Sequence, residues 1–146
     1  MKTYIIKIDS KNEKVELIKC HTISIKLEKI YKVIDCKTPD RIGLSKEVSL
    51  FVDNDGFKRD YTKGFTRKSN KNFTVLGDGC IIKTIGDKLV GFENEEDILK
   101  LCMGFLQDII PFSLDEKMAQ GGIADLDMRG GGASFGPGTG TSDDVP

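Results

Sequence analysis

Short apolar runs bounded by turn residues are the feature that most constrains how this chain folds. Residues 3–8 and 14–20 are two short runs rich in aliphatic residues with polar residues among them, and the five polar residues 9–13 separate the two runs. Runs of this length indicate strands, and a short polar connection indicates an antiparallel hairpin. Further β-rich runs lie at 47–52, 80–85 and 89–92. The chain is therefore predicted to form a mainly antiparallel sheet.

The first of two segments with helical spacing follows the second strand. Apolar residues between positions 23 and 34 recur at intervals of three and four, while lysines occupy the opposite face. This spacing predicts a helix over 24–34, with Ser24 or Thr22 as its N-cap. The alternation of Ile23, Ile25 and Leu27 also fits the start of a strand, so the N-terminal end of this helix stays open.

The second helix is predicted to begin after Asn94, which can cap it, because three acidic residues follow where the helix dipole favours negative charge. Pro111 is expected to end it. Residues 53–56 are interpreted as a hairpin turn that leads into 57–59. The resulting order, β-β-α-β-β-β-β-α, predicts an α+β fold: a single domain over 1–112 with both helices packed on one face of the sheet.

The C-terminal segment has a different composition. Half of the 16 glycines lie in residues 121–146, where four aspartates outweigh one arginine and give a net charge of −3. Such a stretch has little to bury, so residues 113–146 are predicted to be a flexible, Gly-rich acidic tail. Asp143 and Asp144 near its end are candidates for recruiting a partner, and a purely solubilising tail is the alternative.

Cysteine spacing and hydropathy narrow the classes of protein. No apolar run approaches the roughly 18 residues of a membrane-spanning helix, so no membrane partner is expected and the protein is placed in the cytoplasm. The four cysteines stand 16, 44 and 22 residues apart, which indicates buried thiols and no metal site. His21, the only histidine, follows Cys20 in a strand, where neighbours point to opposite faces. We therefore expect no catalytic residues, no cofactor and no enzyme.

A basic segment with interleaved aromatic residues is the strongest functional signal. Residues 58–73 hold six bases and one acid, and three aromatic residues lie among them. Bases neutralise phosphates and aromatic rings stack on nucleobases, so the segment is typical of a surface for single-stranded nucleic acid or a nucleotide-like signal. The alternative is a solvated basic loop whose aromatic residues pack inward. The candidate ligand-binding residues are Lys58, Arg59, Tyr61, Lys63, Phe65, Arg67, Lys68 and Lys71.

Three short motifs also resemble a known family. They are EVSLFVDNDG at 47–56, VLGDGCII at 75–82 and DKLVGF at 87–92. With the N-terminal hairpin and helix, they make residues 4 to 100 similar to the DUF3846 family of uncharacterised proteins from bacterial phages, plasmids and conjugative elements. Between the first two motifs the family usually has a Pro-Asn segment, whereas this chain has the basic aromatic segment. The resemblance implies a mobile-element setting and no particular activity.

These observations give three expectations for function. The first is a non-enzymatic binding protein of a phage or other mobile element, which acts on nucleic acid, a nucleotide-like signal or a host defence protein through the basic aromatic segment. The second is a single-stranded DNA-binding protein whose acidic tail recruits partners. The third is a protein-only inhibitor of a host defence system. The sequence leaves the oligomeric state open.

Overall fold

A computed structural model describes residues 2–56 and 61–114 of the chain. The predicted ligand residues Lys58 and Arg59, and the tail with Asp143 and Asp144, lie outside these residues. The elements are β1 (Thr3–Asp9), β2 (Lys14–Cys20), α1 (Leu27–Ile34), β3 (Pro39–Gly43), β4 (Val48–Asp53), β5 (Lys63–Arg67), β6 (Thr74–Leu76), β7 (Gly79–Ile85), β8 (Lys88–Val90), α2 (Glu95–Asp108) and β9 (Ile109–Ser113).

The described strands form two antiparallel sheets. The main sheet has the order β2-β1-β7-β4-β3, and β8 also pairs with β7. The small sheet has the order β6-β5-β9. The predicted first hairpin is confirmed, because β1 pairs with β2 from Thr3 opposite Cys20 to Asp9 opposite Lys14. The predicted α+β fold with a mainly antiparallel sheet is confirmed as well.

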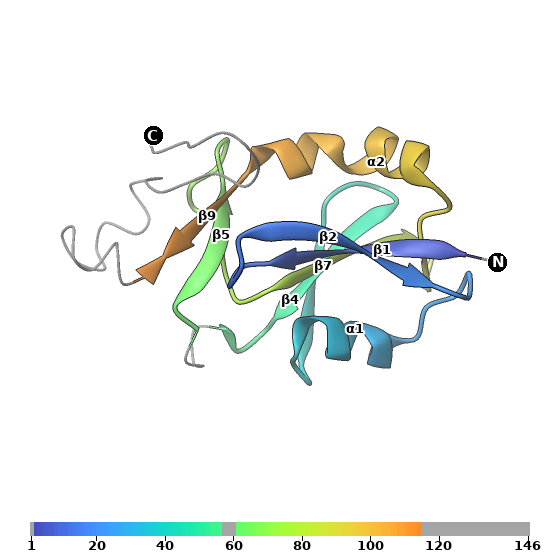
Figure 1. Cartoon of the computed structure of the whole chain (residues 1–146), viewed down its shortest axis with the longest axis horizontal. Helices are drawn as coiled ribbons and strands as arrows, with labels where there is room; N and C mark the ends of the chain where they lie inside the picture. The colour runs from blue at the N-terminus through green and yellow to red at the C-terminus, as the bar shows by residue number, and fades with distance from the viewer. Residues whose placement is uncertain (1, 57–60, 115–146) are drawn as a thin grey trace.

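The two helices lie on opposite faces of the main sheet, which corrects the prediction that both pack on one face (Figure 1). Ile6 of β1 belongs to the apolar cluster that includes Phe105 of α2. Its neighbour Ile5 points the other way, into the cluster that includes Ile30 of α1. All six residues of β4 are buried, so the central strands present two apolar faces and need a helix on each.

Helix α1 begins at Leu27, later than the predicted residue 24, and neither Thr22 nor Ser24 caps it. Its N-cap is Lys26, which makes no side-chain capping bond. The preceding residues pair with β8 instead: Ser24 bridges Val90, and the amide of Ile25 donates to the carbonyl of Leu89. The strand alternative at this end is correct only in part, because Ser24 forms an isolated bridge to β8 and no strand begins there. The pairing with β8 satisfies backbone groups of this segment.

The expected hairpin at 53–56 does not form within the main sheet. Both edges of β4 are already occupied, one by β7 and the other by β3, which the sequence analysis missed. After Asp53 the chain leaves the main sheet and enters the small one at Lys63. The segment 57–59, proposed as the returning strand, lies outside the described residues.

Helix α2 has the predicted cap, since the side chain of Asn94 accepts a hydrogen bond from the amide of Asp97 at 2.8 Å. Pro111 does not end this helix directly. The helix ends at Asp108, and Pro111 lies inside β9, opposite Phe65. The bonds from the Leu114 amide to Thr62 and from the Lys68 amide to Asp108 set the alternation of the ladder, so the nitrogen of Pro111 points away from β5 and costs no ladder bond.

No helix within the described part of the chain is both long and apolar enough to cross a bilayer.

Candidate nucleic-acid interface

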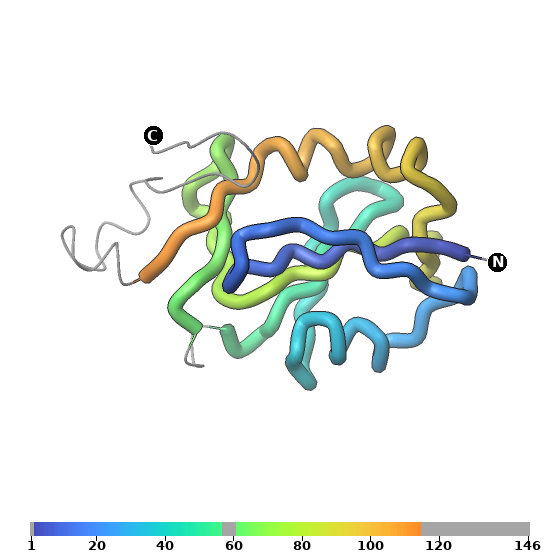
Figure 2. Tube along the Cα trace, viewed as in Figure 1, coloured from blue at the N-terminus to red at the C-terminus, as the bar shows by residue number. Residues whose placement is uncertain are grey.

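The hairpin of β5 and β6 carries the predicted basic segment, as far as it is described. Phe65 lies opposite Val75 in this hairpin, and β9 pairs with the other edge of β5. Figure 2 shows the hairpin at one end of the molecule, with its turn beside the end of α2. Residues 61–76 contain four basic side chains and no acidic one. The structure therefore gathers the described cations of the segment onto one element.

The aromatic residues of the basic segment contact other parts of the protein, and Phe65 is fully buried while Tyr61 and Phe73 are partly buried. Phe65 is 0% exposed and belongs to the apolar cluster on the α2 side. Phe73 meets Phe105 edge to face, with ring centroids 6.0 Å apart. The hydroxyl of Tyr61 donates to a carboxylate oxygen of Asp53 at 3.0 Å. Phe65 therefore packs the core and has no ring face for a nucleobase, which corrects its proposed role as a ligand contact.

Arg67 is built into the fold. Its Nε atom donates to Oδ2 of Asp108 at 2.8 Å. Its guanidinium also lies 5.0 Å from the ring centroid of Phe105 and 5.7 Å from that of Phe73. Lys63, Phe65 and Arg67 share one face of β5 because strand side chains alternate, so the buried position of Phe65 brings Arg67 toward α2. Arg67 thus joins the hairpin to the helix.

Asp108 is the point at which the hairpin turn is fixed. Its carboxylate accepts bonds from the amide and hydroxyl of Ser69, and its carbonyl accepts one from the amide of Lys68. Burial alone would raise the pKa of Asp108, but the hydrogen bonds from Ser69 and Arg67 outweigh it and hold the pKa below its ordinary value. The charged carboxylate therefore stabilises this turn.

The other cations lie nearer to solvent. Lys63 Nζ is 3.6 Å from Oε2 of Glu13, and both side chains are partly exposed. Lys68 is exposed on the turn and forms no ion pair with a described residue. Lys71 is partly buried, and its carbonyl accepts a bond from the hydroxyl of Thr66. Lys63, Lys68 and Lys71 therefore form the cationic surface of the hairpin.

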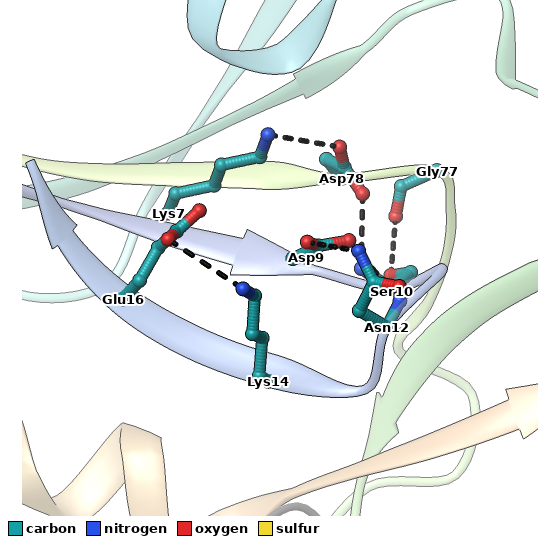
Figure 3. A network of polar contacts seen from close by, with 8 residues as sticks. All are labelled: Lys7, Asp9, Ser10, Asn12, Lys14, Glu16, Gly77 and Asp78. Carbon is teal, nitrogen blue, oxygen red and sulfur yellow. Dashed lines mark hydrogen bonds and ion pairs between the residues drawn. The ribbon is translucent and has the colours of Figure 1, made fainter.

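A polar network joins the base of the hairpin to the main sheet (Figure 3). The buried hydroxyl of Ser10 donates to the carbonyl of Gly77 at 2.6 Å, and the amide of Ser10 donates to Asp78 Oδ1 at 2.9 Å. Burial raises the pKa of Asp78, whose other oxygen lies 3.8 Å from Lys7 Nζ. Gly77 has a φ of +93°, a conformation that glycine tolerates best. These hydrogen bonds thus fix the path of the chain from β6 of the small sheet to β7 of the main sheet.

The described residues contain two further surface features near α1 that sequence reasoning did not single out. A cavity of about 640 Å³ lies at the C-terminal end of α1, and its lining combines Asp53, Asp55 and Asp35 with lysines. A smaller cavity lies at the N-terminal end and is lined by lysines and His21. No group of three or more His, Cys, Asp or Glu side chains in the described ranges is arranged to hold a metal ion.

Comparison of the chain with protein-family models, curated proteins and solved structures found no match. The resemblance to DUF3846 therefore stays a prediction.

Proposed function

We propose that this protein is a non-enzymatic binding protein, acting in a mobile-element setting, that contacts the phosphate backbone of nucleic acid through Lys63, Lys68 and Lys71. The observation that carries the proposal is the one-sided charge of the hairpin: every charged side chain in residues 61–76 is basic. Backbone contacts by lysine supply most of the sequence-independent affinity for nucleic acids.

The inward packing of Phe65 and Phe73 shapes the expected mode of binding. Because Phe65 is fully buried and Phe73 packs against Phe105, the hairpin would bind mainly through phosphates and not through stacking on bases, so single strands and duplexes should bind with similar affinity. Three phosphate contacts would weaken binding roughly 20- to 40-fold between about 50 and about 200 mM salt. Arg67 is excluded from this count, because Asp108 already holds it.

The test uses the full chain and a fluorescein-labelled oligonucleotide, both single-stranded and as a duplex, with fluorescence anisotropy as the readout. The binding variant combines Lys63→Ala, Lys68→Ala and Lys71→Ala and keeps Arg67, so that the turn stays attached to α2. The control variant combines Lys46→Ala, Lys88→Ala and Lys100→Ala. These three lysines are exposed, lie elsewhere in the chain and form no ion pair with another described residue, so the control loses the same net charge.

We expect the hairpin variant to lose at least about tenfold in affinity at low salt, while the control changes by less than about threefold. Equal losses in the two variants would contradict the proposal, because they would show an effect of net charge alone. A strong preference for single strands that survives the hairpin substitutions would favour the single-stranded DNA-binding alternative with its acidic tail. Absence of oligonucleotide binding together with capture of one host protein would favour the protein-only inhibitor.

A further inference from the structure

The smaller cavity beside α1 carries an inference that does not depend on the hairpin. It measures about 280 Å³ and lies between the end of β2 and the start of α1. Its polar lining comes from residues that are distant from the hairpin candidates in the sequence. These are Lys19, His21, Thr22, Ser24, Lys26 and Lys29.

The charge of this cavity is uncompensated. Three lysines line it and no carboxylate does. None of the three ammonium groups forms an ion pair with a described residue. The ion pairs in the described ranges involve other lysines and Arg67. Glu28 is adjacent to Lys29 in the chain but lines the other cavity, at the far side of the helix. All three lysines are exposed to solvent, so three like charges surround one small open cavity whose lining holds no carboxylate.

Two of these lysines also oppose the polarity of α1. Lys26 occupies the N-cap and Lys29 follows one turn later, at the end of the helix where the dipole is positive. Cations at a helix N-terminus reduce stability, and no side chain caps the first turn. A local arrangement that costs stability in the free protein is typical of a site that binds a ligand. An anion bound in the cavity would interact favourably with both the lysines and the helix dipole, so the arrangement would then stabilise the protein.

The backbone around the cavity is held in place before any ligand binds. The hydroxyl of Thr3 donates to the carbonyl of Thr22 at 2.7 Å, and the amide of Gly91 donates to the carbonyl of Ile23 at 3.1 Å. The amide of Ile25 donates to Leu89 at 2.9 Å. Bonds from β1 and β8 thus fix the segment that joins β2 to α1, so little ordering would be needed on binding.

We propose that this cavity binds a small dianion of the phosphate class, either inorganic phosphate or the phosphate group of a small monoester. Lysine ammonium groups act as point-charge phosphate binders, and the hydroxyl of Ser24 and the imidazole of His21 add hydrogen-bonding groups. The hydroxyl of Thr22 is already used, because it donates to the carbonyl of Ser24 at 2.8 Å. The cavity lies near the lower limit of ligand sites, about 300 Å³, which suits one phosphate group with little attached to it. It lies at the opposite end of β2 from Glu13, the partner of Lys63, at a separation of about 20 Å along the strand.

The test measures the thermal unfolding midpoint of the full chain in sodium phosphate and in sodium chloride of matched ionic strength. The cavity variant combines Lys19→Ala, Lys26→Ala and Lys29→Ala, and the control is again Lys46→Ala, Lys88→Ala and Lys100→Ala. Phosphate also stabilises proteins through exclusion from their surface, but that contribution acts on all variants alike. The quantity that decides is therefore the difference between variants in the shift caused by phosphate.

We expect phosphate to raise the midpoint of the wild type and of the control by more than it raises that of the cavity variant. In chloride, the cavity variant should unfold at the same temperature as the wild type or higher, which also shows that it folds. Equal phosphate shifts in all three proteins would overturn the proposal. A monoester such as glycerol phosphate, compared with inorganic phosphate in the same assay, identifies which source binds more tightly.

The two proposals fail separately. The hairpin variant Lys63→Ala, Lys68→Ala and Lys71→Ala leaves the cavity intact, so it should keep the full phosphate shift even where it loses oligonucleotide binding. Loss of the phosphate shift in the hairpin variant would assign the anion site to the hairpin and overturn the inference about the cavity.

Discussion

The hairpin and the cavity beside α1 each carry a group of basic side chains, but the fold treats the two groups differently. In the hairpin, Asp108 holds Arg67 and Glu13 lies beside Lys63. In the cavity, Lys19, Lys26 and Lys29 have no carboxylate partner among the described residues. Basic residues that are close in the sequence can thus serve partly to hold the fold together, whereas lysines that are far apart in the sequence can form one group without carboxylate partners. Substitutions should distinguish the two groups by their effect on the free energy of unfolding.

The largest loss is expected from Gly64→Ala in β5. A Cβ at this position would overlap the carbonyl oxygen of Val75 in β6, so the two strands would have to separate. Overpacking of this kind costs about 3 kcal/mol of unfolding free energy. Urea denaturation measures it, with Gly104→Ala as the control. Gly104 lies in α2 with open space around it, so alanine there should stabilise by up to about 1 kcal/mol.

The next largest effect is expected from Asp108→Ala, which removes the acceptor for Arg67 and Ser69. The loss should be about 2 to 3 kcal/mol, because a partly buried guanidinium is left without its carboxylate. Asp87→Ala removes an exposed aspartate from the turn between β7 and β8 and should change stability by less than about 0.5 kcal/mol. Similar losses in both variants would show that the contact between the hairpin and α2 contributes little.

The same contact should depend on pH. The pKa of Asp108 is lower in the folded protein than its ordinary value of 3.8. Its contribution is therefore complete above that value and is lost as the pH falls through the folded pKa. The difference in unfolding free energy between wild type and Asp108→Asn should be constant near neutral pH and shrink in acid. A gap that persists unchanged in acid would show that the charge of Asp108 is not what stabilises the turn.

The smallest effects should have opposite signs at the two sites. Lys29→Ala relieves repulsion in the cavity and at the helix end, so it should stabilise by a few tenths of a kcal/mol at low salt. Lys63→Ala removes a partly exposed ion pair and should destabilise by a similar amount. Both effects should fade at high salt because exposed charges are screened. Urea denaturation at low salt measures both changes in unfolding free energy. Changes of the same sign in the two variants would contradict the distinction between the two groups of cations.

Local patterns predicted the elements whose determinants lie close together in the chain. The hairpin of β1 and β2 and the cap at Asn94 follow from neighbouring residues. Strand β3 was not predicted, and strand β9 was not predicted because Pro111 was expected to end the second helix. Pro39 begins β3 and Pro111 points its nitrogen outward, so neither removes a ladder bond that the sheet needs. The placement of the helices on opposite faces depends on strand order, which no local pattern contains.

The candidate site was predictable only in part. The alternation of Lys63, Phe65 and Arg67 in a strand places all three on one face, and this signal could have shown that Phe65 draws Arg67 inward. The partner of Arg67 could not be identified, because Asp108 is 41 residues away. The cavity was also predictable only in part. The spacing of Lys26 and Lys29 is visible in the sequence, but Lys19 lies beside them only because β2 packs next to α1.

The outward nitrogen of Pro111 has a consequence for self-association. Strand β9 forms one edge of the small sheet among the described strands, and an edge strand can pair with a second chain and seed aggregates. The ladder alternation directs the nitrogens of Pro111 and Ser113 to the side of β9 that faces away from β5. Because the nitrogen of Pro111 carries no hydrogen, a strand that paired on this side would find no donor at that position. We therefore expect the proline to disfavour β-sheet pairing with a second chain while leaving the pairing with β5 intact.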